Sequence, residues 1–178
     1  MAFERASPER HEFADGEIFA MSGGTAEHSA VTLNLLAELR AALAGRGCRA
    51  FESNMRVHVP ATGRYVYPDG TIVCGRPEFT DEQRDTLLNP SVVIAVLSAG
   101  TEAYDRGDKF AGYRTIPSFM EYVIASQREP RIEVFTRQGD GSWTLRILSA
   151  HDRLELTSIG CAIEIDRVYE GVFDPPSA

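Results

Sequence analysis

The segment TEAYDRGDKFAGY, which begins at Thr101, holds the densest group of side chains that could do chemistry. Glu102, Asp105 and Lys109 are spaced i, i+3 and i+7, so in an α-helix they share one face. Lys109 stands out chemically, because a buried ammonium can lose a proton whereas a guanidinium cannot. The alternative is an exposed Asp105–Lys109 ion pair at i, i+4, which stabilises a helix by about 0.2–0.5 kcal/mol.

The choice of basic residues singles out the same position. Of the 18 basic residues, 17 are Arg and only Lys109 is Lys. A coding bias toward Arg explains this ratio without any function. Under such a bias, a surviving Lys indicates a place where Arg does not serve, because an ammonium is a compact point charge.

Asp69 is the second candidate, in the run Tyr67-Pro68-Asp69-Gly70. Pro68 fixes the backbone at the entry to an expected strand, and Asp69 lies where the chain straightens. The alternative is an ordinary turn, because Pro-Asp-Gly is common turn chemistry. The local sequence by itself favours the turn.

A long helix is expected near the N-terminus. Thr25 is a typical N-cap residue, and the helix is expected to run to about Ala44. Apolar residues recur every four positions and form one stripe that faces a core; they are Val31, Leu35, Leu39 and Leu43.

Strands and turns make up most of the remaining chain. A hairpin is expected in EFADGEIFA, with its turn at Asp15-Gly16. The apolar run Ser91–Leu97 is typical of a strand buried on both faces, and Thr101 is expected to cap a helix to about Arg114. Further strands are expected at residues 49–53, 55–59, 65–67, 70–74, 119–125, 131–137 and 143–148. This order predicts an α/β (α+β) fold, in which helices flank a mixed central sheet.

Length, composition and charge limit the class of protein. The 178 residues fit a single domain, residues 1–178, and no stretch approaches the roughly 20 apolar residues that span a bilayer. The N-terminal segment is charged and lacks the apolar core of a secretory signal, so we expect a cytoplasmic protein that does not associate with membranes. The net charge of −8 opposes binding of nucleic acid through a broad basic surface, so contact with DNA would need a local Arg cluster.

The cysteines and the glycine-rich segments exclude further kinds of site. Cys48, Cys74 and Cys161 lie far apart without a CxxC pair, so we expect small buried side chains and neither a disulfide framework nor a zinc site. The phosphate-binding patterns GxGxxG and GxxxxGK[ST] are absent, so a nucleotide cofactor has no support.

Three long runs resemble, in order, the Uma-two putative restriction endonuclease family of the PD-(D/E)XK nuclease superfamily. They are EFADGEIFAMSGGTAEHSAVTLNLLAELRAAL, YPDGTIVCG and NPSVVIAVLSAGTEAYDRGDKFAGYRTIPSFMEYVIAS. The resemblance extends from about Glu12 to Gly171. It implies a restriction-endonuclease-like core, with helices on both faces of a mixed central sheet.

The resemblance also implies a metal-dependent DNA endonuclease. In this superfamily the Asp of the PD pair and an acidic residue on the next core strand hold Mg²⁺ (or Mn²⁺), which activates a water and neutralises charge on the scissile phosphate. A Lys completes the site. Asp69 matches the first position. Lys109 matches the Lys that Uma-like members offer from the following helix, in place of the position that is Leu97 here.

The second acidic position departs from the family pattern. Uma-like sequences read E-V-L-S on this strand, whereas this chain has Ala95 where the Glu is expected. Ala offers no oxygen to Mg²⁺, so the cation is expected to bind weakly if at all. Asp105, which shares a face with Lys109, is the preferred substitute as catalytic acid and metal ligand. Other acids that could approach this end of the sheet are Asp108, Glu27 and Glu52.

His28, in the run AEHSAV, also matches the family pattern and is a candidate supporting residue. The alternative is a histidine that is packed or hydrogen-bonded at a helix terminus. Glu17 and Glu27 are weaker candidates for a supporting acid.

Three hypotheses for the function remain. The first is a metal-dependent DNA endonuclease, with Asp69 as ligand and Lys109 as the cation that stabilises the transition state; a homodimer is plausible, since cutting both strands needs two centres. The second is an inactive family member that keeps the fold to bind nucleic acid or a protein, which Ala95 supports. The third is an unrelated hydrolase that uses Asp69 and His28, which no feature favours.

Overall fold

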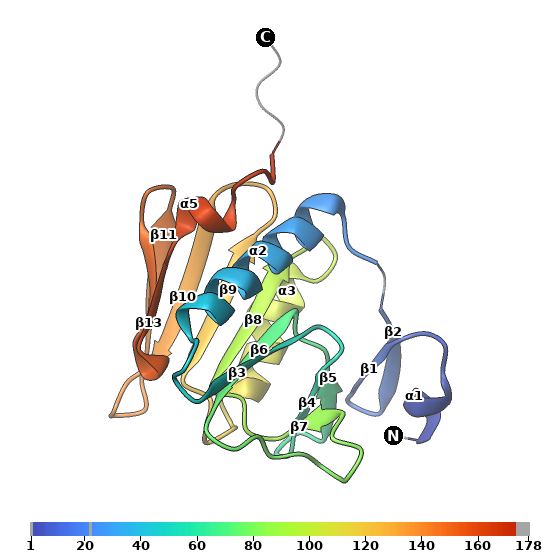
Figure 1. Ribbon diagram of the computed structural model, residues 1–178. Coiled ribbons are helices and arrows are strands. Elements are labelled where there is room, and N and C mark those ends of the chain that lie inside the picture. The colour runs from blue at the N-terminus through green and yellow to red at the C-terminus, as the bar shows by residue number, and fades with distance from the viewer. Residues whose placement is uncertain (1, 22, 174–178) are drawn as a thin grey trace.

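A computed structural model describes residues 2–21 and 23–173 (Figure 1). Within these residues a six-stranded sheet forms the centre, in the order β11-β10-β9-β8-β6-β3. Only β8 and β9 run parallel in this sheet; its other neighbouring strands are antiparallel. The strands are β3 (Cys48–Glu52), β6 (Gly70–Cys74), β8 (Val92–Leu97), β9 (Glu121–Ser126), β10 (Arg131–Arg137) and β11 (Trp143–Ser149). The mixed central sheet expected from the sequence is confirmed.

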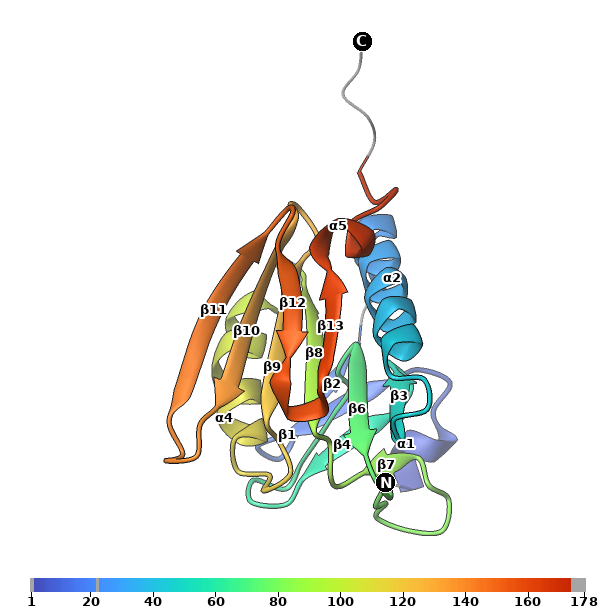
Figure 2. The same cartoon turned by 60° about the vertical axis from the view of Figure 1, so that its left-hand side comes forward.

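Helix α2 (Ala26–Ala42) covers one face of this sheet. The hydroxyl of Thr25 accepts a hydrogen bond from the backbone N–H of His28 at 3.2 Å, so the expected N-cap is confirmed. The stripe of apolar residues is also confirmed, since all four are buried. Figure 2 shows that the hairpin of β12 (Arg153–Leu156) and β13 (Cys161–Glu164), with α5 (Ile165–Val168), lies on the same side as α2. A 3₁₀ turn, η2 (Thr157–Ile159), joins the two hairpin strands.

The opposite face is covered by a short helical segment and by a second sheet. The helical segment consists of α3 (Glu102–Tyr104), the π-helix η1 (Asp105–Lys109) and α4 (Phe110–Tyr113). The second sheet, in the order β2-β1-β5-β4-β7, contains β1 (His11–Ala14), β2 (Glu17–Ala20), β4 (Arg56–Val59), β5 (Arg64–Val66) and β7 (Thr86–Leu87), with α1 (Ala2–Ala6) preceding it. Helices therefore lie on both faces of the central sheet.

Strand β8 lies at the centre and all six of its residues are buried. Val92, Ile94 and Val96 pack with the α2 face, whereas Val93, Ala95 and Leu97 pack with the α4 face. This alternation confirms the expected strand buried on both faces, which is why its sequence is continuously apolar. No helix in the described ranges is both long and apolar enough to cross a membrane.

The expectation that all three cysteines are free is wrong for two of them. Cys48 and Cys74 lie directly opposite each other in the antiparallel β3–β6 pair, and their sulfurs form a disulfide. Cys161 is free and buried, as expected. The separation of 26 residues between Cys48 and Cys74 gave no hint of a bridge, because only the strand register brings them together.

The disulfide is expected to stabilise the fold by restricting the unfolded chain. The variant Cys74→Ser should lower the free energy of unfolding by about 3 kcal/mol without reductant, measured by urea denaturation. In the presence of dithiothreitol the variant and the wild type should have the same stability. Titration of three free thiols in unfolded, unreduced wild-type protein would contradict the pairing.

Candidate active site

The antiparallel pairing of β6 and β8 places Asp69 beside Ala95. Gly70 pairs with Ile94 and Thr71 with Val93, so the next step of the register sets Asp69 opposite Ala95. The Asp69 carboxylate accepts a hydrogen bond from the backbone N–H of Val96 through Oδ2 at 2.7 Å. Asp69 is therefore fixed where the two strands meet, next to the position from which the expected Glu is missing.

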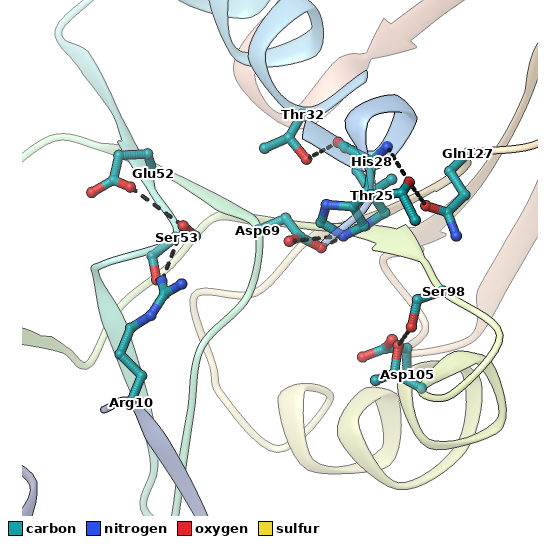
Figure 3. A network of polar contacts seen from close by, with 12 residues as sticks. Arg10, Thr25, His28, Thr32, Glu52, Ser53, Asp69, Ser98, Asp105 and Gln127 are labelled. Atoms are coloured by element: carbon teal, nitrogen blue, oxygen red, sulfur yellow. Dashed lines mark hydrogen bonds and ion pairs between the residues drawn. The ribbon is translucent and has the colours of Figure 1, made fainter. Parts of the chain in front are cut away.

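His28 contacts the same carboxylate from the first turn of α2 (Figure 3). Its Nε2 lies 3.3 Å from Oδ1 of Asp69. The hydrogen bond to Asp69 raises the pKa of His28 above its ordinary value, although partial burial opposes the shift. His28 is thus hydrogen-bonded to the candidate metal ligand. This contact fits a supporting residue, and it equally fits the alternative of a histidine hydrogen-bonded at a helix terminus.

Lys109 is held by two carboxylates from different elements. Its Nζ lies 2.8 Å from Oε1 of Glu12 on β1 and 3.2 Å from Oδ1 of Asp105 on η1. Burial by itself would lower the pKa of Lys109, but the two ion pairs outweigh it and raise the pKa. Asp105 and Lys109 form the ion pair that their i, i+4 spacing suggests. The alternative that this pair is exposed to solvent is wrong, since the Lys109 side chain is only 8% exposed.

Glu12 was not among the sequence candidates. Its carboxylate also accepts a hydrogen bond from the backbone N–H of Tyr67 at 2.9 Å, so it joins β1 to the segment that leads into Asp69. The sequence gives little indication that Glu12 belongs to the site, because an acidic residue in a short strand more often faces solvent. Only the inward direction of this side chain in the folded hairpin reveals its role.

The expected common face of Glu102, Asp105 and Lys109 is only partly correct. Asp105 and Lys109 point together into the buried site, whereas Glu102 pairs with Arg106 at 2.9 Å in a partly exposed position. The middle of the segment is a π-helix, whose wider turn changes the angle between successive side chains. The α-helical periodicity used for the expectation does not hold across that turn.

These groups line one cleft of about 1070 Å³. Of the acids expected to approach this end of the sheet, three line it, namely Asp105, Asp108 and Glu52. It is also lined by Asp69, His28, Lys109, Glu12 and the weaker candidate Glu17. Glu27 is not part of the lining; it is exposed at the start of α2, where hydrogen bonds from its own backbone N–H and from Thr25 lower its pKa.

A complete set of metal ligands is not formed. Within residues 2–21 and 23–173, no group of three or more His, Cys, Asp or Glu side chains is placed to hold a metal ion. The lack of a third ligand agrees with the presence of Ala95, because a Glu at position 95 would add a carboxylate directly beside Asp69. The described part of the cleft therefore presents Asp69 without a second carboxylate on the neighbouring strand.

Comparison with known proteins gives relatives over almost the whole chain. The model of the Uma2 (Uma-two) family, described as "Putative restriction endonuclease", matches residues 1–166. Two uncharacterized proteins of Synechocystis sp. are similar. The protein slr1290 is 34% identical over 97% of this chain and 90% of its own length, and sll1609 is 35% identical over 80% of each.

A solved structure shows the same fold. It is described as a putative nuclease belonging to DUF820 from Anabaena variabilis, and it matches with a TM-score of 0.76 at 13% identity. The match covers 94% of this chain and 93% of that one. At this level of identity the likeness establishes the architecture, which is the restriction-endonuclease-like α+β fold expected from the sequence.

Removing the buried ammonium should destabilise the protein. Lys109→Met leaves the buried carboxylates of Glu12 and Asp105 without their cation, although Glu12 keeps its hydrogen bond from Tyr67. We therefore expect a loss of about 3 kcal/mol in the free energy of unfolding, measured in urea. Arg40→Met, which removes an exposed cation from α2, is the control and should change stability by less than about 0.5 kcal/mol. Equal stability of the two variants would contradict the buried ion pairs.

The pKa values of His28 and His58 should differ, because one histidine contacts a carboxylate and the other is shifted by burial alone. In an NMR titration His28 should have a pKa above about 6.5, and Asp69→Asn should abolish the increase. Because the folded pKa is raised, the His28–Asp69 contact stabilises the fold fully below about pH 6.5 and loses this effect as pH rises through the folded pKa. His58, whose pKa burial lowers, is the internal reference, and a His28 pKa at or below that of His58 would refute the contact.

Proposed function

Because this chain belongs to the Uma2 family of putative restriction endonucleases, we propose that it is a metal-dependent DNA endonuclease of restriction-endonuclease type with a weakened centre. The proposal depends on one observation. Asp69 lies opposite Ala95 at the junction of β6 and β8, and Lys109 lines the same cleft. This is the position where the family resemblance requires a carboxylate pair and a cation for hydrolysis of a phosphodiester bond.

Asp69 is the proposed main ligand for Mg²⁺ or Mn²⁺, with Asp105 as the proposed substitute for the missing Glu. When bound, such a cation neutralises charge on a phosphate and lowers the pKa of a coordinated water. Since the described residues do not supply three close ligands, we expect a low affinity for the cation. Val96 and His28 keep the Asp69 carboxylate in one orientation.

Lys109 is the proposed stabiliser of negative charge on the phosphate. Its ion pairs keep it protonated, and an ammonium has three N–H donors, of which Glu12 and Asp105 use two. The third donor is available to a phosphate oxygen. The Lys109 ammonium therefore serves as a fixed positive charge in this proposal. The proposal does not need Lys109 to lose a proton, although a buried ammonium can do so.

A second function has specific support. An inactive member that keeps the cleft for binding would explain both Ala95 and the neutralisation of Lys109 by two carboxylates. The two functions differ in one result: only for an endonuclease should a carboxylate at position 95 increase the cleavage of DNA.

Nicking of supercoiled plasmid DNA in Mg²⁺ or Mn²⁺ distinguishes them. We expect slow nicking by the wild type, no nicking by Asp69→Ala, and a rate about 100-fold higher in Ala95→Glu, because a second carboxylate completes the cation site. The double variant Asp69→Ala, Ala95→Glu is the control for adventitious nuclease and should be inactive.

Two results would count against this proposal. Nicking that survives Asp69→Ala would show that the activity does not come from this centre. A folded Ala95→Glu protein, checked by circular dichroism, that nicks no DNA would favour the inactive binding protein.

A further inference from the structure

The cleft is acidic in spite of the nuclease fold. Of its described lining residues, seven are carboxylates and two are cations, Arg10 and Lys109. Lys109 is paired with two carboxylates, and Arg10 donates to the backbone carbonyl of Ser53 and lies over the ring of Tyr67. Proteins that bind duplex DNA neutralise many phosphates with Lys and Arg. Arg10 is exposed and has no carboxylate partner among the described residues, so the cleft offers one free cation, far fewer than such binding requires.

Apolar side chains at the cleft offer a different kind of contact. Phe19 on β2 and Leu33 on α2 both line the cleft, and they are 49% and 69% exposed. Met21 and Leu36 extend this apolar lining. Nucleobases stack on exposed aromatic side chains such as Phe19, and this interaction tolerates any sequence because every base has a flat face. An exposed aliphatic side chain such as Leu33 adds apolar contact without stacking. In a paired duplex the flat faces of the bases are covered by neighbouring bases.

Two tyrosines at the cleft carry buried hydroxyl groups. Tyr104 and Tyr113 line the cleft, and neither hydroxyl has a hydrogen-bond partner among the described residues. The Tyr113 side chain is almost completely buried. Buried hydroxyls usually find a partner. Because these two oxygens have almost no accessible surface, they lie beneath the wall of the cleft and are not contacts for a bound ligand.

The size of the cleft limits what can bind. Its volume of about 1070 Å³ is at the upper end of the range for small-molecule sites, which is roughly 300–1000 Å³. This space accommodates a few nucleotides at most. A turn of duplex would have to lie outside the cleft, so supercoiled plasmid DNA would be nicked at segments that are transiently unpaired.

We propose, on the basis of the proposed function, that the substrate is an unpaired DNA segment of a few nucleotides, held by its bases against Phe19 and Leu33. Few phosphates enter the acidic cleft, and a divalent cation, when held by Asp69 and the phosphate itself, would offset part of their charge. Because each centre then acts on one unpaired strand, this substrate removes the reason to expect a homodimer.

Fluorescence anisotropy tests the substrate class without cleavage. The probes are a fluorescein-labelled single strand of about 12 nucleotides and a hairpin duplex of the same sequence, both in Ca²⁺. The single strand should bind about tenfold more tightly than the duplex. Its affinity should depend weakly on salt, with a log–log slope near −1, whereas a protein that neutralises many phosphates has a far steeper slope.

Matched variants locate the contact. Phe19→Ser should weaken single-strand binding about tenfold, which corresponds to the loss of one stacked base. Leu33→Ser should weaken it by a smaller factor, because only apolar contact is lost. Leu145→Ser is the control: Leu145 is 47% exposed on β11 and is not part of the cleft lining, so this variant should bind like the wild type.

Several outcomes would overturn this inference. They are tighter binding of the duplex, a steep salt dependence, no binding of the single strand, or equal affinities of the Phe19→Ser and Leu145→Ser variants. Capture of an Arg-rich peptide in place of DNA would reassign the cleft to a cationic ligand. Failure of the proposed function is recognisable separately, because single-strand binding would then persist while every variant, including Ala95→Glu, leaves DNA uncut.

Discussion

The antiparallel register between β6 and β8 is the constraint on which the candidate site depends. It sets Asp69 opposite Ala95 and brings the Asp69 carboxylate to the backbone N–H of Val96. A shift by one residue would turn these side chains to the other face of the sheet. Such a shift is unfavourable because side chains of different size, Ile94 on one face and Ala95 on the other, would have to exchange between two close-packed cores. The site is thus positioned by the packing of the whole sheet.

The second determinant is a buried group of charges that joins three parts of the fold. Lys109 on η1 binds Glu12 on β1, and Glu12 binds the backbone N–H of Tyr67, next to the segment that carries Asp69. Buried ions are costly unless they are paired and hydrogen-bonded, so this arrangement persists only while the hairpin, the π-helix and the central sheet keep their places. The same pairing keeps a positive charge in a cleft that otherwise carries mostly negative charge.

Local patterns predicted much of this structure, and long-range geometry accounts for what they missed. The cap at Thr25 and the bounds of β6 follow from nearest neighbours in sequence, and both are confirmed. Glu12 and the Cys48–Cys74 disulfide depend on which strands pair, and single-sequence periodicity does not contain that information. The π-helix was missed because the run DRGDK carries no local pattern that separates a π-helical turn from an α-helical one. Asp69 was identified from motif resemblance, since its local sequence favours a simple turn.

The central claim is that Asp69 and position 95 together form the cation site, which this chain retains in part. Calorimetric titration with Mn²⁺ tests it most directly, since binding does not depend on the choice of DNA. The account predicts weak binding by the wild type, an affinity increased by about tenfold or more in Ala95→Glu, and loss of that increase when Asp69→Asn is added. An Ala95→Glu protein that is folded and binds Mn²⁺ no more tightly than the wild type would contradict it.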